Sequence, residues 1–173
     1  MVPSSGTATT VSPALRLTIV RSPLPAGDIA SWAGIPVTSP GRTGFDLARR
    51  MPLFEGVVCV DAMLAARLIT PGDLAASAAA RPGWTGLPRL RQVLLLCDAG
   101  AESPQESRLR LILVAGGLPR PVTQYEVRDA SGVFVARLDM AYPEHKLGIE
   151  YEGDHHRGRG AFRQDLQRIN RLR

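Results

Sequence analysis

The sequence predicts a mixed α/β (α+β) protein, and two observations predict it. In the first half, apolar residues recur at helical spacing between capping residues, prolines and glycines. In the second half, one helix is followed by short runs of alternating apolar and polar residues, which are typical of strands. The pattern changes near Gly100. We therefore expect a disordered tail over residues 1–14, a mainly helical accessory region over 15–100 and a second domain over 101–173.

The first half begins with a tail rich in Ser, Thr, Pro and Gly, a composition typical of disorder. Residues 15–20 alternate and predict a strand, and residues 35–38 are strand-like. Ser39 supplies a helix cap and Pro40 the first helical position, so a helix is expected to run to about Arg49. Further helices are expected over residues 56–69, 71–80 and 87–98.

Two helix starts have the pattern of a capping box. Thr70 and Ser103 each precede a proline, and Asp73 and Glu106 stand three residues after them. In a capping box the cap and the acid bond each other's backbone amides. Gly116–Gly117 should end the second of these helices. Strands are then expected over residues 121–128, 133–142 and 147–152, and a final helix over 161–173.

Residues 137–156 are the most informative part of the chain. Two alternating runs flank a turn at residues 143–146, which is typical of a β-hairpin. Centring the hairpin in this turn places Asp139 opposite Glu150, and the two-residue repeat of a strand places Glu152 on the same face. Like charges opposite one another destabilise a sheet, whereas a hard cation such as Mg²⁺ binds carboxylate oxygens. The spacing therefore predicts half of a metal site.

Basic residues are concentrated at the C-terminal end. The net charge of the chain is +5, and Lys146 is its only lysine. Beyond His156 there are six arginines and a single acidic residue, Asp165. Such a cluster favours a polyanionic partner, with nucleic acid first, although a solvated helix face can have the same composition.

Several classes of protein do not fit the sequence. Cys59 and Cys97 have no metal-like spacing, so we expect two buried, reduced thiols, as in a cytosolic protein. The N-terminus lacks the charged start and apolar run of a signal peptide. No apolar stretch approaches the roughly 18 residues of a membrane span. The sequence therefore predicts a cytoplasmic protein without a membrane segment.

The order of residues across 101–173 resembles that of a known family. The residues that carry the resemblance are Ser103-Pro104-x-Glu106-Ser107-Arg108-Leu109, Gly117-Leu118-Pro119, Gln124, Arg137-Leu138-Asp139, Ile149-Glu150-Tyr151-Glu152-Gly153-Asp154-His155-His156, Asp165 and Arg168. Their order resembles the very-short-patch-repair-like (Vsr-like) endonuclease domains of actinobacterial proteins, in the PD-(D/E)XK superfamily. The resemblance implies a restriction-endonuclease-like core that cleaves DNA.

This resemblance implies roles for five residues. Asp139 and Glu150 match the two strand acids and would hold Mg²⁺ or Mn²⁺, which polarises a phosphodiester and activates water. Glu106 matches the acid on the preceding helix, and Glu152 stands where the superfamily usually has lysine. His156 is the candidate general base or the group that stabilises the leaving group, because the ordinary pKa of histidine lies near neutrality. The arginines implied to hold DNA phosphates are Arg157, Arg159, Arg163, Arg168 and Arg171.

The sequence departs from the family pattern at two points. The usual lysine is absent, so His156 would have to replace it. The family fold also continues beyond the last residue of this chain and has more at its N-terminal side, so we expect a protein truncated at both ends. A sheet that lacks a strand has an unpaired edge, which favours dimerisation.

Structural roles compete with these functional ones. Glu106 has a sufficient role as a capping acid. Arg137 is the register partner of Glu152, so a surface ion pair explains Glu152 without a metal. His145 lies in the predicted turn and is expected to be exposed.

A second resemblance covers part of the first half. The stretch that carries it is Pro36-Val37-Thr38-Ser39-Pro40-x-Arg42-Thr43-x-x-Asp46-Leu47-Ala48, which is similar to one shared with AbiEi-type antitoxin regulators. Arg42 and Asp46 lie four residues apart, so a pair on the helix surface is sufficient to explain them. Trp32 and Trp84 are expected to be packing residues.

The sequence thus leaves three functions open. The main hypothesis is a metal-dependent DNA endonuclease. The first alternative is a non-catalytic, antitoxin-like transcriptional regulator that binds DNA through its N-terminal part and its basic C-terminal helix. The third is an inactive remnant of a truncated gene.

Overall fold

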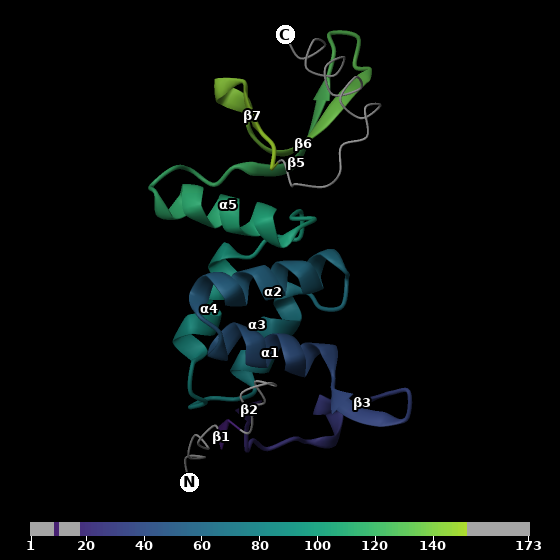
Figure 1. Cartoon of the computed structure of the whole chain (residues 1–173), viewed down its shortest axis with the longest axis vertical. Coiled ribbons are helices and arrows are strands. Elements are labelled where there is room, and N and C mark those ends of the chain that lie inside the picture. Colours follow the sequence, from purple (N-terminus) through teal and green to yellow (C-terminus); the bar gives the residue numbers. More distant parts are fainter. Residues whose placement is uncertain (1–8, 11–17, 152–173) are drawn as a thin grey trace. The chain divides into compact units, whose positions relative to one another are not determined.

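A computed structural model describes residues 9–10 and 18–151 of the chain (Figure 1). The chain divides into two compact units, unit 1 (residues 1–97) and unit 2 (residues 98–173). Helices and small antiparallel sheets make the fold mixed α+β, as the sequence predicts. Within the described ranges, no helix combines the length and the apolar character that a membrane span requires.

Unit 1 is mainly helical. Its elements are β1 (Thr9–Thr10), β2 (Thr18–Ile19), the 3-10 turn η1 (Ala26–Asp28), β3 (Ile29–Trp32), β4 (Ile35–Thr38), α1 (Pro40–Arg50), α2 (Leu53–Ala65), α3 (Pro71–Ala79) and α4 (Leu87–Leu96). The strands form two separate antiparallel pairs, β1 with β2 and β3 with β4. The four helices enclose the apolar core, which includes Phe45, Ala48, Val57, Val60, Leu74, Leu90 and Val93.

The predicted starts of α1, α3 and α4 are confirmed. The Ser39 side chain accepts a hydrogen bond from the backbone N of Arg42 at 3.3 Å, which caps α1. Thr70 and Asp73 form a complete capping box at α3. The bounds of α2 differ from the predicted 56–69, because Pro52 with its fixed φ starts the helix early. Arg67 has a φ of 55°, and this left-handed residue ends the helix before residue 69.

The strands of unit 1 were predicted less well. The expected strand over residues 15–20 is seen only at Thr18–Ile19, and its partner Thr9–Thr10 lies in the tail expected to be disordered. Strand β4 has the predicted bounds. Its partner β3 was missed, because the residues that join them, Ala33 and Gly34, form a two-residue turn without a polar turn residue.

In its described part, residues 98–151, unit 2 consists of one helix beside a three-stranded antiparallel sheet (Figure 1). Its elements are α5 (Pro104–Ala115), β5 (Val122–Arg128), β6 (Phe134–Tyr142), the 3-10 turn η2 (Pro143–His145) and β7 (Leu147–Ile149). The sheet order is β5-β6-β7, with β6 in the centre. Leu111, Ala136, Leu138, Met140 and Ala141 form its buried apolar part.

The β6–β7 hairpin has the register that the sequence predicts. Its partners are Met140 with Ile149, Ala141 with Gly148, and Tyr142 with Leu147. Strand β7 ends at Ile149 instead of continuing to Glu152. The final helix expected over residues 161–173 lies outside the described residues.

Candidate functional site

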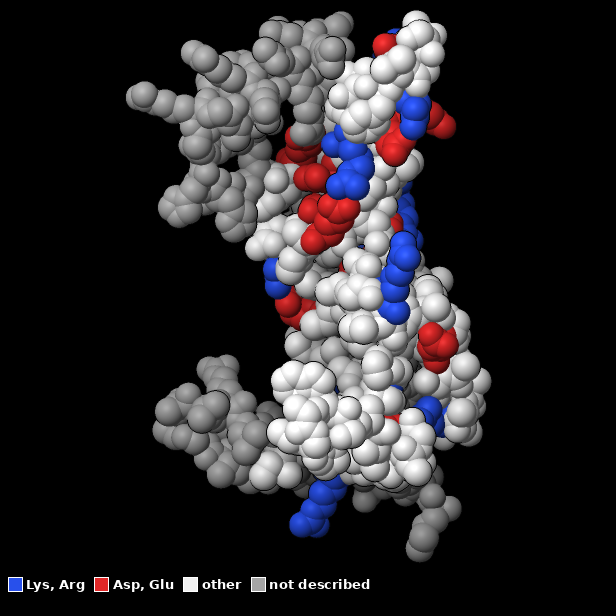
Figure 2. All heavy atoms as spheres, turned by 90° about the vertical axis from the view of Figure 1, so that its right-hand side faces the viewer, with Lys and Arg blue, Asp and Glu red and all other residues white. Residues whose placement is uncertain are grey.

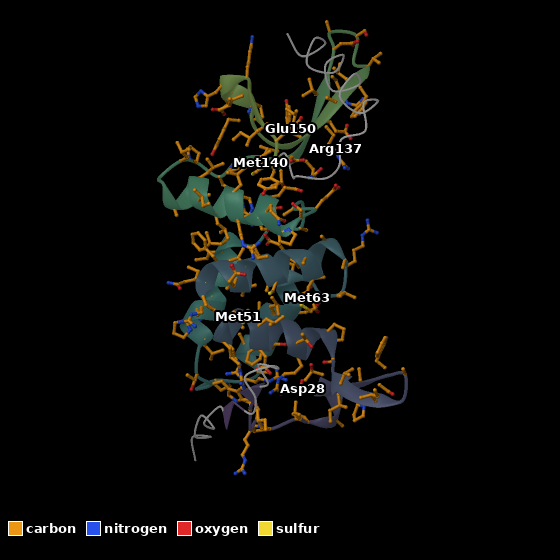
Figure 3. All side chains as sticks on the ribbon, viewed as in Figure 1. Asp28, Met51, Met63, Arg137, Met140 and Glu150 are labelled. Carbon is orange, nitrogen blue, oxygen red and sulfur yellow. The ribbon has the colours of Figure 1, made fainter. Side chains whose placement is uncertain are left out.

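The predicted carboxylate pair lies where β7 ends. Asp139 is half-buried in β6 and precedes Met140, whose register partner is Ile149. Glu150 follows Ile149 directly and is exposed, at the end of the sheet where Figure 3 labels it. The backbone N of Tyr151 donates a hydrogen bond to Asp139 Oδ2 at 2.8 Å. The hairpin therefore gives Asp139 and Glu150 neighbouring positions. The Asp139 carboxylate also binds the backbone just after the end of β7.

Glu106 connects the start of α5 to the sheet. It is 9% exposed, and its Oε2 accepts hydrogen bonds from the backbone N of Glu102 at 3.0 Å and from Gln124 Nε2 at 3.2 Å. The predicted cap is present, since Ser103 Oγ accepts from the Glu106 amide at 3.2 Å. The carboxylate, however, bonds the amide of Glu102 where the capping-box pattern predicts that of Ser103, and it also accepts from Gln124 on β5.

Gln124 is the functional candidate with the least usual backbone. Its φ of 51° is left-handed, a region that only a few per cent of residues other than glycine adopt. The β5–β6 register places it opposite Asp139, between the Thr123–Met140 and Tyr125–Leu138 pairs. In the sequence, Gln124 was noted only as part of a motif. In the structure, it lies opposite Asp139 and its side chain bonds Glu106.

The described part of the chain, residues 9–10 and 18–151, contains no group of three His, Cys, Asp or Glu side chains that could hold a metal ion. Carboxylate oxygens such as those of Asp139 and Glu150 are chemically suitable for Mg²⁺. The remaining predicted site residues lie outside the described residues, and these are Glu152, His156, Arg157, Arg159, Arg163, Arg168 and Arg171. The metal site therefore stays a prediction.

The described part of unit 2 exposes acidic and basic side chains in similar numbers. Residues 98–151 contain eight acidic side chains and six basic ones, and Figure 2 shows acidic side chains gathered on one face of this unit. Arg137 Nη2 forms an ion pair with Glu102 Oε2 at 3.0 Å, a pairing that the sequence did not suggest. His145 is exposed, as predicted.

The structure corrects the interpretation of Arg42. Its guanidinium is 2% exposed and lies inside unit 1, where a surface pair was expected. Arg42 Nη1 donates to Asp28 Oδ2 at 2.7 Å, and Arg42 Nε donates to Asp46 Oδ2 at 2.9 Å. The remaining donors bond Pro23 O at 2.8 Å and Ser22 Oγ at 2.7 Å. Arg42 thus joins α1 to the segment that precedes β3, in which Figure 3 labels Asp28.

Two further arginines complete this buried ion network, which we define as Asp28, Arg42, Asp46, Arg49 and Arg81. Arg81 Nη2 lies 2.6 Å from Asp28 Oδ1, and Arg49 Nη2 lies 2.6 Å from Asp46 Oδ1. The three guanidinium groups surround the Trp84 ring, with their central carbons 5.1 to 5.8 Å from its centroid. Trp84 is therefore a packing residue, as predicted, whereas Trp32 is 72% exposed and the prediction for it is wrong.

Within the buried ion network, Asp28 and Arg42 stabilise each other's charges, whereas burial outweighs the hydrogen bond to Asp46 and lowers the pKa of Arg49. Burial by itself would raise the pKa of Asp28, but hydrogen bonds from Arg42 and Arg81 outweigh it and hold the pKa below its ordinary value. Burial opposes the charge of Arg42 in the same way, and hydrogen bonds to Asp28 and Asp46 raise its pKa. These groups therefore remain ionised at neutral pH.

Outside the buried ion network, exposed arginines outnumber exposed acids on the surface of unit 1. Five arginines of residues 19–97 are exposed, whereas Asp73 is the one exposed acidic residue in that range. The exposed arginines are Arg21, Arg50, Arg67, Arg89 and Arg91. Arg89 Nη1 bonds the backbone O of Met51 at 3.1 Å and approaches that of Arg50 at 3.4 Å, which brings Arg89 beside the end of α1. Sequence analysis missed this surface because it could not tell which arginines are internally neutralised.

Comparison with known families assigns unit 1. Residues 1–96 match the family described as the AbiEi antitoxin C-terminal domain, which is more than half of the 173 residues. The chain belongs to this family. The matched region contains the whole buried ion network. The AbiEi-like stretch recognised in the sequence lies within it and covers β4, the Ser39 cap and the Arg42–Asp46 part of the network. The comparisons support this part of the predicted resemblance and give no support to its endonuclease part.

Two curated relatives of this AbiEi-family chain are both described as uncharacterized proteins. They are MT2308 of Mycobacterium tuberculosis strain CDC 1551 / Oshkosh and Rv2248 of strain ATCC 25618 / H37Rv. Each is 30% identical over 136 residues, which are 78% of this chain and 50% of the relative. The chain thus spans about half the length of the curated relatives it matches. No solved structure matches it.

Proposed function

We propose that this AbiEi-family chain is a non-catalytic, antitoxin-like transcriptional regulator that binds DNA. The family match supports this proposal, and the observation that carries it is the charge distribution of unit 1, with five exposed arginines and one exposed acidic residue in residues 19–97. A surface of this kind attracts the phosphate backbone of DNA and releases the cations condensed on it. This release of counterions supplies nearly all of the free energy of non-specific DNA binding.

The internal pairing makes this argument stronger than a count of arginines. Arg42, Arg49 and Arg81 are paired inside unit 1 with Asp28 and Asp46, so two of their three charges are neutralised there. The exposed arginines have no comparable number of exposed acids beside them. Arg50 and Arg89 are the candidates for phosphate contacts, because both are exposed and Arg89 is held against the end of α1 that carries Arg50. Arg50 Nε also lies 3.4 Å from Asp46 Oδ1, an ion pair that DNA phosphate would have to replace.

We expect the chain to bind double-stranded DNA with an affinity that falls steeply with salt. The double variant Arg50→Gln, Arg89→Gln should bind more weakly and should reduce the slope of log K against log salt concentration by about 1 for each lost phosphate contact. Fluorescence anisotropy with a labelled duplex between low and physiological salt measures both quantities.

The matched control is Lys146→Gln, which removes an exposed basic residue from unit 2. It should leave affinity and slope unchanged. A second pair, Arg163→Gln with Arg168→Gln, tests the C-terminal arginines suggested by the sequence. If only this second pair weakens binding, the phosphate contacts belong to the C-terminal segment and the role proposed for unit 1 is wrong.

We propose metal-dependent DNA cleavage as a second candidate, because the hairpin register gives Asp139 and Glu150 neighbouring positions. These carboxylates would hold Mg²⁺ or Mn²⁺, and a metal bound there would polarise a phosphodiester and activate water. His156 would accept a proton from that water. This candidate ranks second because the family match concerns unit 1 and an antitoxin.

The second candidate predicts nicking of supercoiled plasmid in the presence of Mg²⁺ or Mn²⁺. Asp139→Ala and Glu150→Ala should each abolish nicking and leave DNA affinity near that of the wild type. Glu144→Ala removes an exposed carboxylate from the turn of the same hairpin and should have no effect. If the wild type leaves the plasmid intact with both metals, cleavage is excluded and the DNA-binding proposal is untouched.

A further inference from the structure

The β3–β4 hairpin, residues 29–38, presents an exposed apolar face. The register pairs Trp32 with Ile35 and Ala30 with Val37, and directly opposite residues of a hairpin project from the same face. Trp32 is 72% exposed, Ile35 58% and Val37 39%. An exposed tryptophan flanked by two exposed aliphatic residues is a common feature of contact surfaces between proteins.

The hairpin is held firmly at its base and projects from the helices of unit 1 (Figure 1). The backbone N of Ser39 bonds Asp28 O at 2.8 Å, and the Asp28 carboxylate belongs to the buried ion network. At the other end, Ala33 with φ 50° and Gly34 with φ 80° form the tight turn that matches the twist of two paired strands. An apolar face fixed in this way needs little ordering when it binds, which favours association.

The composition of the hairpin argues against DNA as its occupant. Residues 29–38 contain no charged side chain, although the rest of the unit 1 surface is basic. A hairpin that enters a DNA groove normally carries arginine or lysine to contact the adjacent phosphates. The uncharged face is instead the part of unit 1 where two basic copies can approach without direct repulsion between arginines.

We propose that this face joins two copies of the chain in a two-fold symmetric dimer, in which Trp32 of one copy packs against Ile35 and Val37 of the other. A two-fold contact uses the same patch twice, so an uncharged apolar patch is complementary to itself. Addition of a strand along β4 is disfavoured, because Pro36 has no N–H to donate. Packing of face against face therefore fits the hairpin best. This inference does not depend on DNA binding.

The size of the face sets the strength of the dimer. A largely exposed tryptophan with two aliphatic neighbours offers on the order of 300 Å² per copy, well below the roughly 800 Å² per partner of a standard stable interface. The dimer should therefore be weak and in rapid exchange, with a dissociation constant in the micromolar range or above.

Sedimentation velocity of the full chain without DNA, from about 1 to 300 μM, tests this proposal over the range that such an affinity requires. The wild type should pass from monomer to dimer. Trp32→Ser, Ile35→Thr should raise the dissociation constant about tenfold or more, and Trp32→Ser alone should act in the same direction. The matched control, Ile112→Thr, changes a residue on α5 that is 60% exposed and should dimerise like the wild type.

Three results would overturn the proposal: a wild type that stays monomeric over the whole range, hairpin variants that dimerise as the wild type does, or an equal loss in Ile112→Thr. Circular dichroism of each variant confirms that the fold is retained. Since sedimentation is performed without DNA, failure of the DNA-binding proposal leaves this test intact.

Discussion

Replacing Arg42 with alanine should lower the free energy of unfolding of unit 1 by about 3 to 5 kcal/mol, the usual cost of removing one partner from a buried ion pair. The guanidinium is 2% exposed and bonds Asp28, Asp46, Pro23 O and Ser22 Oγ. Its loss leaves buried acceptors without those donors, and it removes one of the cations around Trp84. Urea unfolding followed by tryptophan fluorescence measures the change.

Arg50→Ala is the matched control, because Arg50 lies on the same helix and approaches the same Asp46 at 3.4 Å. Its side chain is about a third exposed, so its loss should cost less than about 1 kcal/mol. Acid should also distinguish the two variants. Asp28 has a lowered folded pKa, so its stabilising term is complete above the ordinary value of 3.8 and is lost as pH falls through the lowered pKa. Arg42→Ala should lose less stability in that window than the wild type or Arg50→Ala, and equal losses in all three would contradict the role given to the network.

Gly86→Ala should destabilise unit 1 by about 3 kcal/mol or more, because it combines a strained backbone with a clash. Gly86 has a φ of 89°, and a β-carbon there would lie 2.2 Å from the backbone O of Arg49. The loop before α4 is held at this distance, since Arg49 Nη1 bonds the backbone O of Thr85 at 3.0 Å. Thermal unfolding followed by circular dichroism reports the loss.

Gly83→Ala separates the two contributions to that cost. Gly83 has nearly the same backbone, with a φ of 80°, but a β-carbon there meets nothing within 4 Å. It should therefore cost only about 1 kcal/mol, the strain of a left-handed alanine. If both variants lose the same stability, the close approach between the α4 loop and the end of α1 is not a tight constraint.

Local sequence signals predicted much of the fold correctly, because they describe interactions between residues close in the chain. The Ser39, Thr70 and Ser103 caps start α1, α3 and α5 as expected. The β6–β7 register followed from the spacing around the turn at residues 143–146, because a one-residue slip would reverse every side chain. Strand β3 was missed, because it is only four residues long and largely exposed, so its sequence does not alternate clearly between apolar and polar residues.

The candidate site was predicted only in part. The sequence selected Asp139, Glu150 and Glu106, and the structure gives the first two neighbouring positions on the hairpin. The sequence could not show that Gln124 donates a hydrogen bond to Glu106, since this bond joins elements far apart in the chain. It could not show that the Tyr151 amide bonds Asp139 either, since that bond depends on where β7 ends.

By itself, the sequence determined the helix caps, the hairpin register and the net positive charge of this AbiEi-family chain. Only the tertiary structure decided which of those charges are available to a partner. Arg42 and Arg50 are equivalent in the sequence, each four residues from Asp46, yet one is enclosed with Asp28 and the other reaches the surface. The physical reason is that a charge can meet a partner only where it reaches solvent, and burial is a property of the packed fold.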